Sequence, residues 1–82
     1  MTPPEVRLVL YSRAGCHLCE VAAADLVELG EPFEEIDITS DPELEMEYGD
    51  RIPVIMLDGR EHGYWRVEKE RLRTDLRLSS PG

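Results

Sequence analysis

The sequence is poor in basic residues and has no long apolar run. It has nine lysines and arginines against 18 aspartates and glutamates, for a formal net charge of −9. A chain this acidic repels a phosphate backbone and offers no basic stripe, so we expect it to bind neither DNA nor RNA. The first apolar run, Val6 to Tyr11, is broken by Arg7 and is far too short for a signal or membrane segment. Nucleic-acid binding and membrane insertion are therefore not expected.

The length of 82 residues leaves room for one domain and one modest core, and we assign residues 1–82 to a single domain. We find no internal repeat, linker or low-complexity tract. A hydrophobic fraction of 41% and a charged fraction of 33% are typical of a soluble globular protein. Because no positively charged leader is recognisable, we expect the protein to be cytoplasmic, and we expect a monomer.

Cysteine is also scarce: the chain has two, Cys16 and Cys19, both in the segment "YSRAGCHLCE". In a reducing compartment a close cysteine pair is more often catalytic, redox-sensing or metal-binding than a permanent disulfide. A structural zinc site usually needs four ligands, and the histidines His17 and His62 would have to complete the set without a second cysteine pair, so we expect no metal. Two small core residues at helical spacing remain an alternative interpretation.

The apolar pattern predicts an α/β domain with the element order βαβαββα. Strands are expected at 5–11 and 33–38 and in a hairpin at 53–65 that turns at Asp58 and Gly59; helices are expected at 16–29, 40–49 and 67–78. The first helix should bury a stripe made of Leu18, Ala22, Leu26 and Leu29. The second should begin with a capping box of Ser40 and Glu43. Such an order builds one four-stranded mixed sheet flanked by helices.

The predicted layout places Cys16 where the first strand ends and the first helix begins. Unpaired backbone N–H groups and the positive end of the helix dipole favour a thiolate at that position. We therefore predict that Cys16 is the nucleophile. Cys19 lies one turn further into the helix and is better placed to resolve a mixed disulfide than to start one.

The segment "YSRAGCHLC" resembles the active-site segment of the glutaredoxins, which are small members of the thioredoxin superfamily. A second segment, "RIPVIMLDG" at residues 51–59, is similar to the Thr-Val-Pro segment, strand and turn of that family. The likeness covers about residues 5–76. It implies a thioredoxin-like fold and a thiol-disulfide oxidoreductase that reduces protein or glutathione mixed disulfides. It implies no bound cofactor; glutathione, another thiol reductant or a reductase would supply the electrons.

The resemblance also implies roles for five residues around the cysteine pair. Pro53 would be a cis-proline beside the pair, and the backbone of Ile52 would pair with an extended substrate. Arg13 would stabilise the thiolate and hold a carboxylate of glutathione, with Arg51 as a second cationic candidate. His17, between the cysteines, would tune the reactivity of the thiol.

The sequence departs from the glutaredoxins after the hairpin. Glutaredoxins usually carry two glycines and then an acidic residue there, which together hold the γ-glutamyl end of glutathione. This chain keeps Gly63 but follows it with Tyr64, Trp65 and Arg66, so the glutathione site looks incomplete. Two other functions remain open: a non-catalytic thioredoxin-like module that binds a protein at the Ile52–Pro53 edge, and a metal or iron–sulfur protein.

Overall fold

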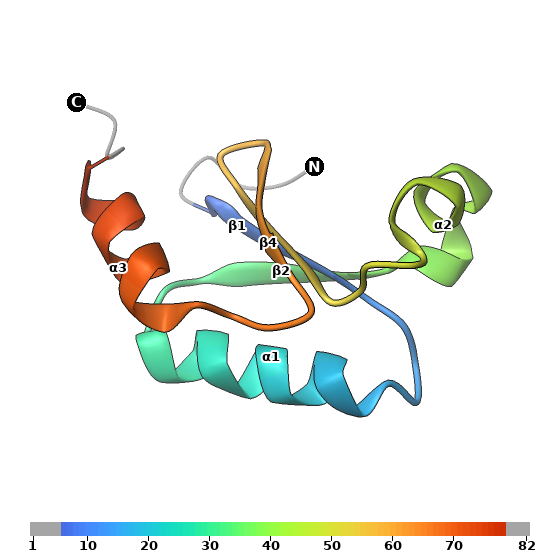
Figure 1. Cartoon of the computed structure of the whole chain (residues 1–82), viewed down its shortest axis with the longest axis horizontal. Helices are drawn as coiled ribbons and strands as arrows, with labels where there is room; N and C mark the ends of the chain where they lie inside the picture. Colours follow the sequence, from blue (N-terminus) through green and yellow to red (C-terminus); the bar gives the residue numbers. More distant parts are fainter. Residues whose placement is uncertain (1–5, 79–82) are drawn as a thin grey trace.

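The computed structural model describes residues 6–78 and has the predicted element order, with one extra helical turn (Figure 1). The strands are β1 (Leu8–Ser12), β2 (Phe33–Asp37), β3 (Val54–Leu57) and β4 (Arg60–Tyr64). The helices are α1 (His17–Leu29), the short 3₁₀ helix η1 (Ile38–Ser40), α2 (Pro42–Tyr48) and α3 (Lys69–Leu78). The tail at 79–82, predicted to fray, lies outside the described residues.

The four strands form one mixed sheet in the order β2-β1-β3-β4, which confirms the predicted sheet. β1 is parallel to β2 and antiparallel to β3, and β4 is antiparallel to β3. In the parallel pair Ser12 lies opposite Asp37, so β1 and β2 end at the same edge of the sheet. The chain leaves β1 at this edge to reach the two cysteines, which places them outside the carboxyl end of a central strand.

Helices α1 and α3 pack on one face of the sheet, whereas α2 lies apart from them beyond the end of β2 (Figure 1). The core is formed by buried apolar side chains of β1, β3, the two helices and the segment before α3: Leu8, Leu10, Ala22, Leu26, Ile55, Leu57, Val67, Leu72 and Leu76. This core fixes the start of α1 relative to the end of β1. It thereby fixes the position of the cysteine pair.

The β3–β4 hairpin turns at Asp58 and Gly59, as predicted. Both residues have positive φ angles, 53° and 82°, which is the backbone that the two-residue turn of a right-twisted hairpin requires. Aspartate tolerates this conformation better than most side chains, and glycine adopts it without steric cost. The turn lies at the opposite edge of the sheet from the cysteines, because Leu57 pairs with Leu8 at the start of β1.

Two local predictions are wrong. Leu18 was expected in the buried stripe of α1 but is 53% exposed, and Cys19 is buried in its place with Ala22 and Leu26. Leu18 and Cys19 lie four and three residues before Ala22, so both fit the helical spacing, and the packing of α1 on the sheet buries Cys19. The expected stripe was one residue out of phase in its first turn.

The start of α2 differs as well. Asp41, not Ser40, caps the helix, and its carboxylate accepts a hydrogen bond of 3.0 Å from the backbone N–H of Glu43. Ser40 instead ends η1. Proline is favoured in the first helical position, where its missing N–H is not needed, so Pro42 starts the helix and the residue before it becomes the cap.

Candidate active site

Cys16 is the N-cap of α1, and its thiol is hydrogen-bonded to a backbone N–H of the first helical turn. Its Sγ accepts a hydrogen bond of 3.3 Å from the backbone N–H of Cys19. The N–H of Cys16 donates to the carbonyl oxygen of Arg13 at 3.2 Å, which closes the turn between β1 and α1. Gly15 has φ of 79° in this turn, a conformation that suits glycine. The sulfur of Cys16 is partly exposed and points at the unpaired N–H groups of a helix.

Cys19 is in a different environment, one turn further along α1. It is only 2% exposed. Burial raises the pKa of the Cys19 thiol to about 11, and the contact with Cys16 and the nearby charge of Glu35 act in the same direction, whereas a hydrogen bond with the Arg13 backbone opposes them. Cys19 is therefore a thiol at neutral pH. One sulfur is accessible and bound by a backbone donor, and the other is buried and protonated.

A hollow of about 400 Å³ opens beside the cysteine pair. It is lined by the end of β1, the turn after it, the first turn of α1 and two residues of β2: Ser12, Arg13, Ala14, Gly15, Cys16, Cys19, Glu20, Glu35 and Asp37. The hydroxyl of Ser12, a buried residue, donates to the carboxylate of Glu35 at 2.8 Å. The hollow therefore combines the two sulfurs with three carboxylates and one guanidinium.

Sequence reasoning missed Glu35 and Asp37 as residues of the site. They are separated from Cys16 by the whole of α1 and come close only because β2 lies parallel to β1 in register. The carboxylate of Asp37 accepts hydrogen bonds from the backbone N–H and the hydroxyl of Thr39, and these hold its pKa below the usual range. The available signal was the charged end of the predicted strand "FEEIDI" beside the end of a central strand.

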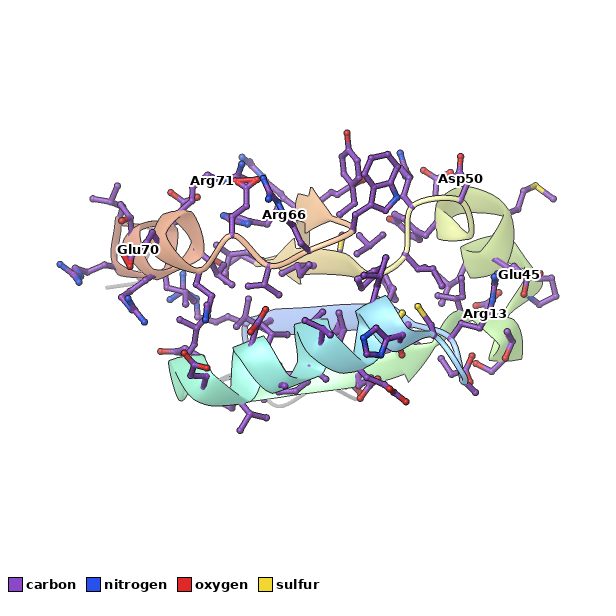
Figure 2. The ribbon with its side chains drawn as sticks, turned by 60° about the horizontal axis from the view of Figure 1, so that its bottom comes forward. Arg13, Glu45, Asp50, Arg66, Glu70 and Arg71 are labelled. Atoms are coloured by element: carbon purple, nitrogen blue, oxygen red, sulfur yellow. The ribbon has the colours of Figure 1, made fainter. Side chains whose placement is uncertain are left out.

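Arg13 precedes the cysteine pair and His17 lies between the two cysteines, and the structure places their side chains differently. Figure 2 shows Arg13 directed from the cysteine loop toward Glu45 of α2, and its guanidinium is 4.0 Å from the Glu45 carboxylate. Arg13 nevertheless lines the hollow. The imidazole of His17 is 84% exposed and 3.8 Å from the carboxylate of Glu20. The structure thus brings Arg13 to the site and leaves His17 on the solvent side of α1.

Arg51 lies against α2 and β4. Its guanidinium donates to the carbonyl oxygen of Glu47 at 2.9 Å and stands 5.5 Å from the centre of the Tyr48 ring. It is also 3.8 Å from the carboxylate of Glu61. Arg51 was predicted as a second cation that binds substrate. Its guanidinium instead contacts α2 and β4, and Arg51 does not line the hollow beside the cysteines.

Ile52 and Pro53 precede β3 at the edge where β1 ends, because Val54 pairs with Tyr11. The peptide bond between them is cis. The carbonyl oxygen of Pro53 accepts a hydrogen bond of 2.7 Å from the backbone N–H of Trp65. The start of β3 is thereby tied to the residue that follows β4.

An exposed aromatic pair, Tyr64 and Trp65, lies at this edge. The two rings meet edge to face with centroids 4.9 Å apart, and the residues are 47% and 55% exposed. Trp65 has φ of 72°, a conformation that is uncommon for a bulky residue. The hydrogen bond from the Trp65 N–H to the Pro53 carbonyl oxygen holds the backbone in this conformation. An exposed indole therefore occupies a position where glycine would fit without strain.

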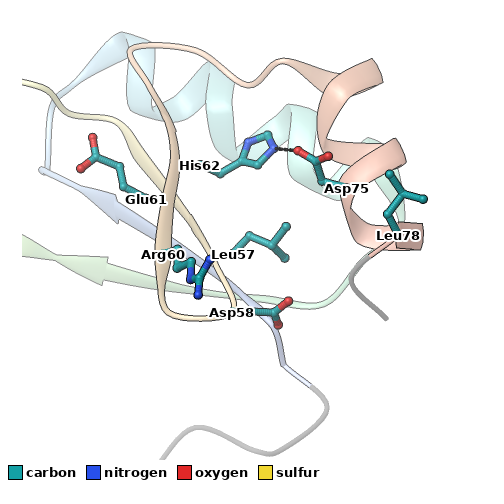
Figure 3. A pocket seen from close by; sticks show the side chains of 7 residues that line it. All are labelled: Leu57, Asp58, Arg60, Glu61, His62, Asp75 and Leu78. Carbon is teal, nitrogen blue, oxygen red and sulfur yellow. Dashed lines mark hydrogen bonds and ion pairs between the residues drawn. The ribbon is translucent and has the colours of Figure 1, made fainter. Parts of the chain in front are cut away.

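A larger hollow, of about 550 Å³, lies at the other edge of the sheet, between the hairpin turn and α3 (Figure 3). Its histidine, His62, is hydrogen-bonded to Asp75 at 2.7 Å, and Arg71 donates to the His62 carbonyl oxygen. These bonds join β4 to α3. Among residues 6–78 no group of three or more histidine, cysteine or acidic side chains is arranged to hold a metal ion. Within the same range, the helices are too short or too polar to cross a membrane.

Comparison with protein families identifies the domain. The sequence profile of the glutaredoxin-like domain (DUF836) matches residues 7–77. The uncharacterized protein Rv0508 of Mycobacterium tuberculosis is 44% identical over 91 residues, which cover 100% of this chain and 92% of the relative. The match spans the strands, the helices and both cysteines of the described structure.

Solved structures show the same fold. The X-ray structure of XcR50 from X. campestris has a TM-score of 0.76 and 38% identity, covering 88% of this chain and 97% of that one. A glutaredoxin from Brucella melitensis has a TM-score of 0.61 and 27% identity, covering 98% and 91%. Thioredoxin-like chains of lower identity share the fold as well. The predicted thioredoxin-like architecture is confirmed.

Proposed function

The chain belongs to the glutaredoxin-like domain family (DUF836), and from that premise we propose that it is a dithiol thiol-disulfide oxidoreductase. The observation that supports this proposal best is the inequality of the two sulfurs. Cys16 is accessible and accepts a backbone N–H, whereas Cys19 is buried with a pKa of about 11. The two-step reaction needs an accessible thiol that attacks the substrate and a neighbouring thiol that attacks the mixed disulfide.

In the first step the Cys16 thiolate attacks one sulfur of a substrate disulfide. A bond forms between Cys16 and that sulfur, the substrate S–S bond breaks, and the other substrate sulfur leaves with the electron pair as a thiolate. The Cys19 N–H stabilises the attacking thiolate at the helix N-terminus.

In the second step Cys19 loses its proton to water and attacks the Cys16 sulfur of the mixed disulfide. The bond between Cys16 and the substrate breaks, and the remaining substrate sulfur leaves as a thiolate. Two electrons have then passed from the protein to the substrate, and the protein holds a Cys16–Cys19 disulfide. A thiol reductant, either glutathione or a reductase, returns the protein to the dithiol.

We further propose that the substrate is a protein disulfide or a small-molecule disulfide and that the protein works in the cytoplasm, where reductant is available. The substrate would lie across the edge formed by the cysteine loop and the Ile52–Pro53 segment. The described structure has no acidic residue in the three positions after Gly63, so the family's usual contact with the glutathione ammonium group is not reproduced there.

The test is to trap the intermediate. With reduced protein and a model peptide disulfide, Cys19→Ser should complete the first step and accumulate a mixed disulfide on Cys16, visible as an added peptide mass. Cys16→Ser should lose disulfide reduction by about a thousandfold or more, because it removes the nucleophile. Equal reduction rates for the wild type and Cys16→Ser would contradict the proposal and favour the non-catalytic binding module.

A further inference from the structure

The sheet edge at the cysteine loop carries two different surfaces on its two sides. Reading across the strands, β2 ends at Asp37, β1 at Ser12 and β4 at Tyr64, and β3 starts at Val54 between the last two. The cysteines follow β1. The carboxylates of β2 therefore flank them on one side, and the aromatic pair at the end of β4 lies two strands away on the other.

On the first side the charge beside the nucleophile is acidic. The hollow contains the carboxylates of Glu20, Glu35 and Asp37 but only one guanidinium, that of Arg13. Glu20 is 74% exposed, and the hydrogen bonds from Thr39 keep Asp37 ionised. Arg13 is itself close to the carboxylate of Glu45. Cys16 lines the same hollow, so a substrate that reaches its sulfur there passes beside these carboxylates.

On the second side an aromatic pair is exposed, and it is followed by an exposed arginine, Arg66. Tyr64 and Trp65 form an edge-to-face pair at the segment that is bonded to Pro53. Aromatic faces attract lysine and arginine side chains, at about 0.5–1 kcal/mol for exposed pairs. This observation is independent of the carboxylates and favours the same chemistry in the ligand.

Resting on the proposed function, we propose that the substrates are protein disulfides in which lysine or arginine lies close to the reacting cysteine. Neighbouring strands are about 4.8 Å apart and an extended chain advances about 3.3 Å per residue. A basic residue within about two positions of the cysteine reaches the carboxylates, and one about three positions away on the other side reaches the aromatic pair. Glutathione, which is anionic, gains from neither surface.

Three peptide disulfides test this inference. Each is a homodimer of a seven-residue peptide with a central cysteine, in which all three positions on either side are lysine, glutamine or glutamate. The reduced full-length wild type is mixed with each peptide under single-turnover conditions, and the loss of the Cys16 thiol is followed by quenching and mass spectrometry. Because attraction between opposite charges raises association rates by about 10- to 1000-fold, we expect the lysine peptide to react at least tenfold faster than the glutamate peptide at low salt.

Salt and charge variants identify the source of the preference. The ratio of lysine to glutamate peptide rates should fall to within about threefold at 0.5 M salt, where exposed charges are screened. In Glu20→Gln/Glu35→Gln the ratio should drop several-fold at low salt, and the amide at position 35 still offers an oxygen to the Ser12 hydroxyl. The matched control is Glu28→Gln/Glu70→Gln, which changes the net charge equally but far from the cysteines, and it should keep the wild-type ratio.

The aromatic side has its own variants. Trp65→Leu should lower the lysine peptide rate about twofold to fivefold without changing the glutamine peptide rate, since it removes the ring but keeps an apolar residue. Trp65→Phe should restore most of the loss.

The outcomes separate the two proposals. Equal rates for all three peptides, or a preference that both double variants reduce alike, would overturn this inference and leave the oxidoreductase intact. Absence of reaction with every peptide, including the uncharged one, would overturn the proposed function and this inference with it.

Discussion

Polar side chains make different contacts at the two edges of the sheet where the strands end, the hairpin edge with the Asp58–Gly59 turn and the cysteine edge with Cys16 and Cys19. At the hairpin edge the guanidinium of Arg7 donates to both oxygens of the Asp58 carboxylate, at 2.9 and 2.8 Å, and to the Leu76 carbonyl oxygen at 3.0 Å. At the cysteine edge Arg13 approaches its carboxylate only to 4.0 Å, and Glu20 is mostly exposed. At the first edge the hydrogen bonds of Arg7 tie the hairpin turn to α3, and at the second several carboxylates lie around the Cys16 sulfur. We infer that stability depends mainly on one edge and chemistry on the other.

The largest expected effect comes from the hairpin edge. Leu57→Ala removes a core side chain that is 8% exposed at the end of β3, and should lower the free energy of unfolding by about 2–5 kcal/mol. Urea denaturation followed by circular dichroism measures the loss. Met56→Ala, on the less buried face of the same strand, is the control and should cost clearly less. The rate of Cys16 alkylation in the folded variant should stay at the wild-type value; a large fall in that rate would show that the two edges are not independent.

The second prediction compares the two thiols. Because the pKa of Cys19 is raised to about 11, only about one thiol in a thousand is ionised at pH 8, and the site is buried as well. Iodoacetamide should therefore modify Cys16 at least about a hundredfold faster than Cys19, as resolved by peptide mapping. The Cys19 rate should rise about tenfold per pH unit up to about pH 11. Similar rates at pH 8 would contradict the unequal roles of the two sulfurs.

The smallest effect concerns Arg7. Arg7→Gln breaks the paired contact with Asp58 and should lower the midpoint of urea denaturation by much less than Leu57→Ala does, because the contact is exposed to solvent. Arg60→Gln is a matched control, because Arg60 lines the same hollow as Asp58, and it should leave the midpoint of urea denaturation almost unchanged.

The same contact predicts a pH dependence. Arg7 holds the pKa of Asp58 below its ordinary value, so this carboxylate stabilises the fold above about pH 4 and the stabilisation is lost as pH falls further. Arg7→Gln should flatten the acid limb of the stability profile. An unchanged limb would mean that other carboxylates control unfolding in acid.

Much of the fold could be predicted because its signals are local. The Asp58–Gly59 turn, the cysteine spacing and the apolar run of β1 each lie within a few residues. Which residue of the first turn of α1 is buried was harder to predict, because Leu18 and Cys19 both fit the helical spacing with Ala22. The packing of the helix on the sheet decides between them, and the sequence pattern does not contain that packing.

Only the part of the candidate site that is local in the sequence could be predicted. Cys16 and Cys19 are visible in the sequence because they are close together in it. Glu35 and Asp37 reach the site only through the parallel register of β1 and β2, which a sequence pattern does not specify. Arg51 shows the reverse error: it precedes Ile52 in a motif that resembles a substrate edge, but its guanidinium faces α2 and β4.

Trp65 is the only tryptophan in the chain, and it stands half exposed at the edge where the cysteines lie. The indole fluorescence of the protein therefore comes from one ring. The backbone N–H of the same residue donates a hydrogen bond to the Pro53 carbonyl oxygen. A molecule bound across that edge will change the polarity around this ring, while events at the hairpin edge will leave its spectrum almost unaltered. The protein thus carries a built-in fluorescent probe of the edge where its cysteines lie, and no dye has to be attached to observe it.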